Sequence, residues 1–200
     1  EVREDHLGSV LNGGNSAPGG DNRTSPAAWV ALADEFWLAS TDKTGGRTGI
    51  PALWGTDAVH GPNNIVGATI FPHNIGLGAA NNANLMYQIG TVTAKELLAT
   101  GLDWTFAPTI AVVRDDRWGR TYESYSEDPA IVREYAGYLV EGIQGKLSDN
   151  TFLDEDHLIA TAKHFIGDGG TIDGRDQGDN ISSEEDLRDI QGAGYPVAIN

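Results

Sequence analysis

The chain has 200 residues, 40% of them hydrophobic, which is enough to bury the core of one domain. Its 29 acidic residues against 13 lysines and arginines give a net charge of −16, which argues against nucleic acid or an anionic membrane as partner. There is no cysteine, so disulfides and cysteine-ligated zinc are excluded. No apolar run approaches the roughly 20 residues of a membrane span, and the stretch EVREDHLGSV lacks the apolar core of a signal peptide.

The first predicted helix covers residues 24–40. Ser25 is suited to the N-cap and Pro26 to the first helical position. An apolar stripe at helical spacing follows, consisting of Trp29, Leu32, Ala33, Phe36 and Trp37. After a glycine-rich turn, the short apolar run 50–55 predicts a strand that ends just before Asp57.

The same alternation of helix and strand then repeats. Residues 82–101 predict a helix closed by glycine, and 102–112 predict a strand. Asp128 caps a helix over 128–145, residues 157–165 predict a third strand, and 182–190 start another helix. The cap of that last helix is expected to be a capping box of Ser182 with Glu185.

Strands that alternate with helices predict a parallel sheet covered by helices. No glycine-rich phosphate-binding signature follows a strand, so a doubly wound nucleotide-binding sheet is disfavoured. Instead, Asp57, the loop 114–128 and the pair Lys163 and His164 each follow a strand, as active-site residues of a barrel do. A whole barrel takes about 250 residues. The sequence therefore predicts an α/β fold, a (β/α)8 TIM-like barrel that is incomplete in this chain.

Four motifs carry a family resemblance: GTDAVHG, ATIFPHNIGLGA, TFAPTIAVVRDDRWGRTYESYSEDP and AKHFIGDGGTIDG. Together they resemble the N-terminal barrel domain of glycoside hydrolase family 3, in particular β-D-glucan exohydrolases and β-glucosidases. The resemblance implies a retaining exo-acting enzyme, a β-glucosidase or exo-1,3/1,4-β-glucanase, that releases glucose from the non-reducing ends of β-glucans and β-glucosides. It also implies that residues 1–200 are part of a larger multidomain glycosidase that is secreted or periplasmic.

The resemblance assigns the binding of the terminal glucose to Asp57, Arg120, Lys163 and His164. Sugar chemistry supports the assignment, because one carboxylate can accept adjacent hydroxyl groups while cationic side chains donate to their oxygens. Asp57 would be the acceptor, and the other three would be donors. The family also suggests a strained backbone from Lys163 through His164 to Phe165, for example with a cis peptide bond between non-proline residues.

The glucosidase branch of the family takes its nucleophilic aspartate from a later barrel strand and its acid/base glutamate from a second domain. No match to the nucleophile motif occurs in residues 1–200, so no catalytic residue is expected in this segment. Glu123 and Asp168 are expected to bind the sugar-binding cations and hold them in place, without contacting the sugar themselves. If the segment does contain a catalytic carboxylate, the candidates are Glu123, Glu127 and Asp168.

Neither a metal nor a cofactor is expected. His60 and His73 could join His164 around a metal, but no metal-binding spacing connects them. The aspartate-rich run 167–179 lacks the order of ligands of a calcium loop and is expected to be structural.

Two rival functions remain open. One rival is a non-catalytic glycan-binding module, and the other is a β-xylosidase or β-N-acetylglucosaminidase of the same family. The N-acetylglucosaminidase branch resembles KHFPGHGDT, whereas this chain reads KHFIGDGGT, which disfavours that branch.

Helical aromatic residues are expected in the core: Trp29, Trp37, Tyr135 and Tyr138. Trp54 and Trp118 lie nearer the predicted mouth of the barrel, and the sequence leaves open whether they are core residues or platforms for a sugar.

Overall fold

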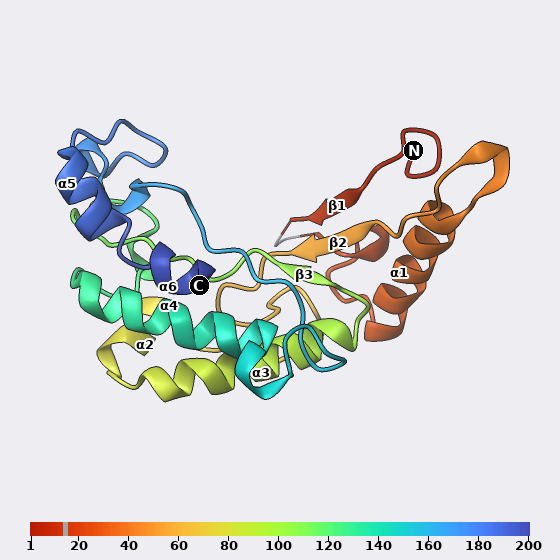
Figure 1. The fold of residues 1–200 in the computed structure, drawn as a ribbon, viewed down its shortest axis with the longest axis horizontal. Coiled ribbons are helices and arrows are strands. Elements are labelled where there is room, and N and C mark those ends of the chain that lie inside the picture. The colour runs from red at the N-terminus through yellow and green to blue at the C-terminus, as the bar shows by residue number, and fades with distance from the viewer. Residues whose placement is uncertain (14–15) are drawn as a thin grey trace.

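The computed structural model describes residues 1–13 and 16–200 (Figure 1). Its sheet has three parallel strands that neighbour one another in chain order: β1 (Ser9–Asn12), β2 (Leu53–Thr56) and β3 (Trp104–Thr105). In the register of the sheet, Ser9 pairs with Leu53 and Gly55 pairs with Trp104. Parallel strands joined through helices in this order are the repeating unit of a barrel wall.

The helices lie along one side of the sheet and at both ends of the molecule. They are α1 (Pro26–Thr41), α2 (Asn74–Ala79), α3 (Ala83–Leu98), α4 (Pro129–Gln144), α5 (Glu184–Asp186) and α6 (Tyr195–Ile199). A π-helical turn, Leu187–Gln191, follows α5. Figure 1 shows α3 and α4 side by side, with α1 beside β1 and β2 at one end and α5 at the other. Among the described residues, no helix has the length and apolar character needed to cross a membrane.

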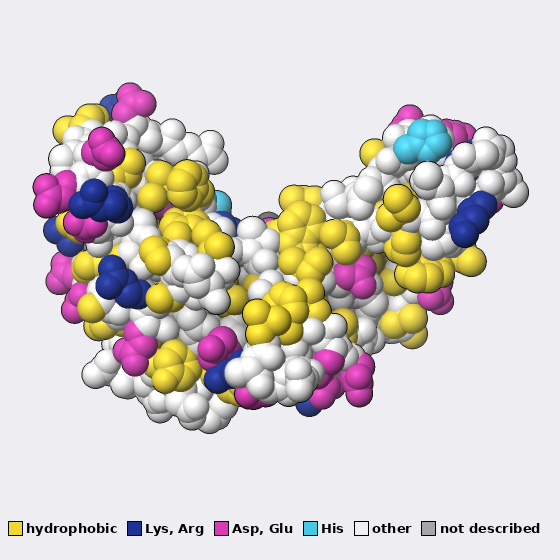
Figure 2. Space-filling view, in the orientation of Figure 1, with side chains coloured by type: hydrophobic (Ala, Val, Ile, Leu, Met, Phe, Trp, Pro, Cys, Tyr) yellow, Lys and Arg dark blue, Asp and Glu magenta, His cyan; other side chains and the backbone are white. Residues whose placement is uncertain are grey.

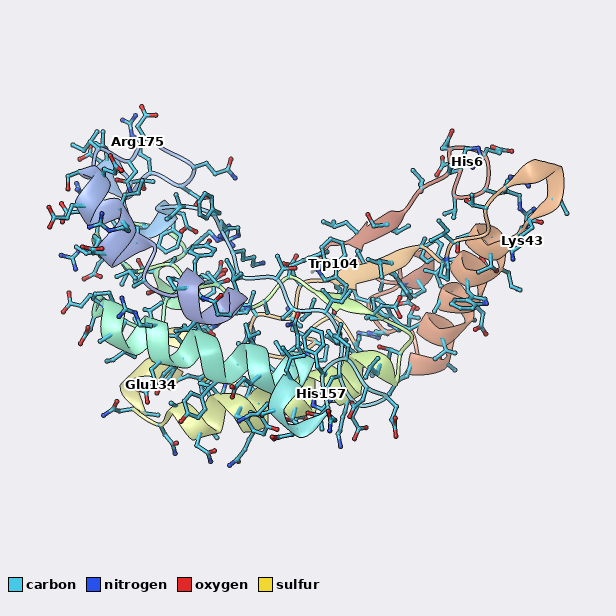
Figure 3. All side chains as sticks on the ribbon, in the orientation of Figure 1. His6, Lys43, Trp104, Glu134, His157 and Arg175 are labelled. Atoms are coloured by element: carbon cyan, nitrogen blue, oxygen red, sulfur yellow. The ribbon has the colours of Figure 1, made fainter. Side chains whose placement is uncertain are left out.

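The surface is hollowed between the end that carries α5 and the end that carries β1 and α1 (Figure 2). Trp104 of β3 lies near the middle of the molecule, whereas Arg175 lies at the α5 end (Figure 3). The main core lies between the sheet and the helices α1, α3 and α4, and it includes Trp29, Trp54, Met86, Leu97, Val132, Tyr135 and Leu139.

Two glycines allow α3 and α4 to pack closely. A Cβ at Gly90 would lie 2.8 Å from the backbone oxygen of Leu139, and one at Gly142 would overlap the backbone oxygen of Tyr87. Because every other residue type has a Cβ, only glycine permits this approach of the two backbones. The contact fixes how these two helices pack behind the sheet.

The predicted strands are shorter in the structure than the apolar runs suggest. The run 102–112 keeps only Trp104–Thr105 as β3, since Pro108 has no N–H to donate to a ladder. Residues 157–165 do not form a regular strand, although the backbone N–H of Ile110 donates to the carbonyl of Lys163 at 2.8 Å. Bridges to Trp104 and Thr109 keep that segment parallel to β3.

Other local predictions need correction. The strand β1 and the helix α2 are absent from the prediction, and the cap of the helix near residue 183 is shifted. Ser183, not Ser182, accepts the hydrogen bond from the backbone N–H of Asp186 at 3.0 Å, so Glu185 takes no part in a capping box. The side chain of Ser25 makes no capping hydrogen bond, although the residue stands at the N-cap.

Two helical aromatic residues predicted in the core lie at the surface. Trp37 is 58% exposed and Tyr138 is 38% exposed. Only Trp29 of the first apolar stripe is fully buried, because no described element covers the outer side of α1.

Candidate functional site

Asp57 and Lys163 form an ion pair at the carboxyl end of the sheet. Asp57 follows β2 directly, and Lys163 ends the segment that runs beside β3. The ammonium of Lys163 lies 2.6 Å from the carboxylate of Asp57, and the lysine side chain is only 13% exposed. Pairing of the opposite charges makes this degree of burial tolerable for lysine.

Arg120 and Glu123 form a second, bidentate pair around the 3-10 turn Thr121–Glu123. Arg120 donates from Nε to Oε1 of Glu123 at 2.6 Å and from Nη2 to Oε2 at 2.8 Å. Oε2 also accepts from the hydroxyl of Thr109 at 3.3 Å. Such a fork of two parallel hydrogen bonds fixes the guanidinium in one plane.

The electrostatics of this pair follow from its burial. Glu123 is 6% exposed. Burial by itself would raise the pKa of Glu123, but the hydrogen bonds and positive charge of Arg120 outweigh it, and the pKa lies below its usual value. The same hydrogen bonds raise the pKa of Arg120. Both groups are therefore charged at neutral pH.

His164 connects Arg120 to Asp168. Nη2 of Arg120 lies 3.1 Å from Nε2 of His164, and Nδ1 lies 2.7 Å from Oδ2 of Asp168. Because a guanidinium can only donate, Nε2 is the acceptor and Nδ1 carries the proton that is donated to the carboxylate. Both ring nitrogens are thus engaged within the protein, and the predicted role of His164 as a donor to sugar stays a prediction. The Lys163–His164 and Phe165–Ile166 peptide bonds are cis, as the resemblance suggested for the first of them.

A pocket of about 260 Å³ lies between these pairs. It is lined by Asp57, Val59, His60, Asn63, Arg120, Tyr122, Glu123 and Lys163. Three of the four predicted sugar-binding residues therefore face one pocket, and the fourth, His164, contacts one of these three, Arg120. Three further lining residues were not predicted from the sequence: Val59, Asn63 and Tyr122. The available signal was their position in the sequence, because Val59 and Tyr122 lie inside two of the motifs that carry the family resemblance and Asn63 follows the first of these motifs.

His60, which lines the pocket, belongs with His73 to a cluster of aromatic rings. The two rings pack edge to face with centroids 4.7 Å apart, and His73 packs in the same way on Tyr122 at 4.6 Å. Nδ1 of His60 lies 3.2 Å from the carbonyl of Phe71, and burial together with the neighbouring His73 lowers the pKa of His60. Within residues 1–13 and 16–200, no group of three histidines or carboxylates is arranged to hold a metal.

The loop that carries Asp168 is fastened to the segment before the Arg120 turn. Gly169 lies so close to Val112 that a Cβ would overlap its carbonyl oxygen, and the N–H of Arg114 donates to the carbonyl of Gly169 at 2.8 Å. The indole N–H of Trp118 donates to Asp176 at 2.9 Å. Trp118 is 1% exposed, so it anchors this loop and offers no face to a sugar.

Two further sequence assignments can be placed. Trp54 is 2% exposed and stacks on Trp29 with centroids 5.6 Å apart, which makes it a core residue. The carboxylate of Asp128 accepts from the N–H of Ala130 at 2.8 Å, which confirms it as the N-cap of α4.

The family profile described as "Glycosyl hydrolase family 3 N terminal domain" matches residues 1–200. The chain belongs to glycosyl hydrolase family 3. The family 3 domain is also similar to a solved structure, the exo-1,3/1,4-beta-glucanase from a Pseudoalteromonas species, with a TM-score of 0.95 and 58% identity. That match covers 100% of this chain and 25% of the glucanase. The prediction of a TIM-like barrel that is incomplete in this chain is thereby confirmed.

Two curated relatives extend the comparison. A "Lysosomal beta glucosidase" from Dictyostelium discoideum is 30% identical over 177 residues, covering 86% of this chain and 21% of that protein. A "Beta-xylosidase" from Formosa agariphila is 32% identical over 158 residues, covering 76% of this chain and 22% of that protein. The chain thus spans about a quarter or less of the relatives that it matches.

Proposed function

We propose that the complete protein is a retaining, exo-acting β-glucosidase or exo-1,3/1,4-β-glucanase, and that residues 1–200 supply most of its glucose-binding residues. The observation that carries the proposal is that Asp57, Lys163 and Arg120 line one pocket, with Lys163 hydrogen-bonded to Asp57. A carboxylate beside two cations matches a sugar, whose adjacent hydroxyl groups donate and accept at the same time.

Each charged group has a defined task in this proposal. Asp57 accepts hydrogen bonds from two neighbouring hydroxyls, and Lys163 and Arg120 donate to hydroxyl oxygens. The partners that already bind these groups, Asp57 for Lys163 and Glu123 for Arg120, hold them in place before the sugar arrives. Such preorganised contacts lower the barrier when they strengthen as the sugar ring flattens toward an oxocarbenium ion.

The bond-breaking step itself is assigned to groups outside this segment. A retaining glycosidase needs a carboxylate nucleophile and a carboxylic acid on either side of the scissile bond. We infer that residues 1–200 are part of an N-terminal catalytic barrel domain, and that later barrel strands and a second domain of the same protein supply these two groups. The small share of each relative that this chain spans supports a longer parent protein.

The polymer substrate and the cellular location follow from the same proposal. The 58% identity to an exo-1,3/1,4-beta-glucanase favours a β-glucan or its oligosaccharides as substrate. We propose a secreted or periplasmic location, where such polymers are found. The lysosomal designation of the Dictyostelium relative supports a compartment outside the cytosol.

The deciding experiment uses the full-length protein and a panel of aryl β-glycosides. Release of glucose from the β-glucoside, with the β-anomer as the first product by NMR, supports a retaining glucosidase. A clear preference for the aryl β-xyloside or the N-acetylglucosaminide would replace this activity by one of the alternatives. Saturable glucose binding without any hydrolysis would instead identify a glycan-binding module.

A further inference from the structure

The start of α2 braces the turn Thr121–Glu123 at two adjacent points. The ring of His73 packs edge to face on Tyr122 with centroids 4.6 Å apart. The amide of Asn74 donates from Nδ2 to the backbone carbonyl of Glu123 at 2.7 Å. Neither His73 nor Asn74 lines the pocket, but the turn that they hold carries Glu123, which does.

Packing alone does not explain an asparagine at position 74. Its side chain is 1% exposed, and in the described part of the chain its Oδ1 is buried without a hydrogen-bond partner. A buried amide oxygen without a partner costs free energy, so an apolar side chain of similar size would fill this space more favourably. The feature that an apolar side chain could not replace is the N–H donor to Glu123.

Glu123 connects Asn74 to Arg120: its backbone carbonyl is held by Asn74, and its side chain binds the guanidinium. Its carboxylate accepts both guanidinium hydrogen bonds, and its own burial leaves it little freedom to turn. We propose that Asn74 is a positioning residue that acts through Glu123 to hold the guanidinium of Arg120 at the pocket. The role of that guanidinium in sugar binding rests on the proposed function.

The first test compares Asn74→Ala with a matched control, Asn82→Ala, in the full-length protein. Asn82 caps α3, where its Oδ1 accepts from the N–H of Leu85 at 3.3 Å, so the control also removes one amide hydrogen bond. At a temperature where circular dichroism shows both variants folded, kcat/KM on an aryl β-glucoside should fall about 10- to 100-fold for Asn74→Ala. The control should stay close to wild type. Equal losses in the two variants would overturn the proposal.

The second test replaces the amide by a carboxyl group of the same shape. In Asn74→Asp, a protonated carboxyl group can still donate to the carbonyl of Glu123, whereas an ionised one cannot. The ratio of kcat/KM of the variant to that of the wild type should therefore rise as the pH falls. A ratio that stays low at every pH would contradict a donor role.

The third test asks whether the effect passes through Glu123. In a Glu123→Ala background, Asn74→Ala should cause no further loss, because the two residues act as one unit. Crystal structures of wild type and Asn74→Ala should show Arg120 displaced in the variant. If the wild type hydrolyses no β-glycoside, the proposed function fails, and the crystal structures still decide the inference. An unmoved Arg120 would overturn it.

Discussion

Lys163 and Asp57 are 106 residues apart in the chain, yet their ammonium and carboxylate groups lie 2.6 Å from each other. Asp57 follows β2, and Lys163 lies on the segment at the other side of β3, so the pair spans β3 at the carboxyl end of the sheet. Only a parallel arrangement brings both strand ends to the same edge. The pair therefore ties the barrel topology directly to the pocket.

Removing the charge of Asp57 should impair function more than folding. In the full-length protein, Asp57→Asn keeps the shape of the side chain but weakens its acceptance of two hydroxyl hydrogens. We expect a loss of about 2–4 kcal/mol in transition-state stabilisation, measured as kcat/KM on an aryl β-glucoside. Near-wild-type turnover together with an unchanged melting curve would show that Asp57 is not a sugar ligand.

The pair of Glu123 and Arg120 should make stability depend on pH in a predictable direction. The pKa of Glu123 is lowered in the folded protein, below the ordinary glutamate value of about 4.3. Its stabilising contribution is therefore fully present above that ordinary value and is lost as the pH falls through the folded pKa. The melting temperature of full-length Glu123→Gln should lie below that of wild type at neutral pH, and the gap should narrow in acid.

The control for this pH dependence is Glu134→Gln. Glu134 is an exposed residue of α4 (Figure 3). Its replacement should leave the melting temperature close to that of wild type across the same pH range. A gap for Glu123→Gln that stays constant from neutral to acidic pH would refute the assignment of a lowered pKa.

The contact between α3 and α4 should tolerate no side chain at Gly142. A Cβ there would overlap the carbonyl of Tyr87, so Gly142→Ala should force the helices apart and cost about 1–3 kcal/mol of unfolding free energy. Gly137, on the same helix, is the control because a Cβ there would meet Val197 at an ordinary 3.8 Å. Gly137→Ala should be neutral or stabilising by about 0.5–1 kcal/mol. Urea denaturation of both variants makes the comparison.

Residues 1–200 alone should neither hydrolyse β-glucosides nor behave as a monomer. Among the residues that the structure describes, β1 pairs only with β2, and the large apolar side chains of Leu11, Leu38 and Ile50 are 69%, 65% and 69% exposed. An unpaired strand edge beside such surface favours association. Light scattering and a glucose-release assay on the segment and the full-length protein would check both statements. A monodisperse, active segment would place the reacting carboxylates within it.

The long helices could be predicted from the sequence because each carries its own start signal. Pro26, Asn82 and Asp128 stand at or beside the first turns of α1, α3 and α4, and apolar residues at helical spacing follow them. The position of the capping serine near α5 could not be decided locally, because Ser182 and Ser183 are adjacent and acidic residues follow both at the required spacing.

The strands were harder to predict because their definition depends on neighbours. The residues of β1 show no strong apolar pattern and become a strand only by pairing with β2. The segment before Lys163 has a strongly apolar pattern, but Pro108 and the irregular backbone beside it leave it only isolated bridges. Pairing partners and bends of this kind are tertiary properties that propensity does not contain.

The candidate site was more accessible to sequence reasoning, since charged residues after buried runs are unusual. Asp57 and Lys163 could be singled out in this way, whereas Arg120 was assigned through the family resemblance, and the structure places all three around one pocket. The sequence could not show that His164 accepts from Arg120, because the protonated nitrogen is defined by the position of Asp168. The bracing of Glu123 by Asn74 likewise depends on how α2 packs.

The fastening of the loop 167–176 bears on how firmly Arg120 is held at the pocket. This loop is held to residues 112–118 by a close backbone approach at Gly169 and by the hydrogen bond between Trp118 and Asp176. The loop carries Asp168, whose carboxylate accepts from His164, and His164 in turn accepts from Arg120 at the pocket. Because the loop is held at two points, this chain of hydrogen bonds has a fixed base, and the guanidinium of Arg120 is supported from the side of Asp168 as well as by Glu123.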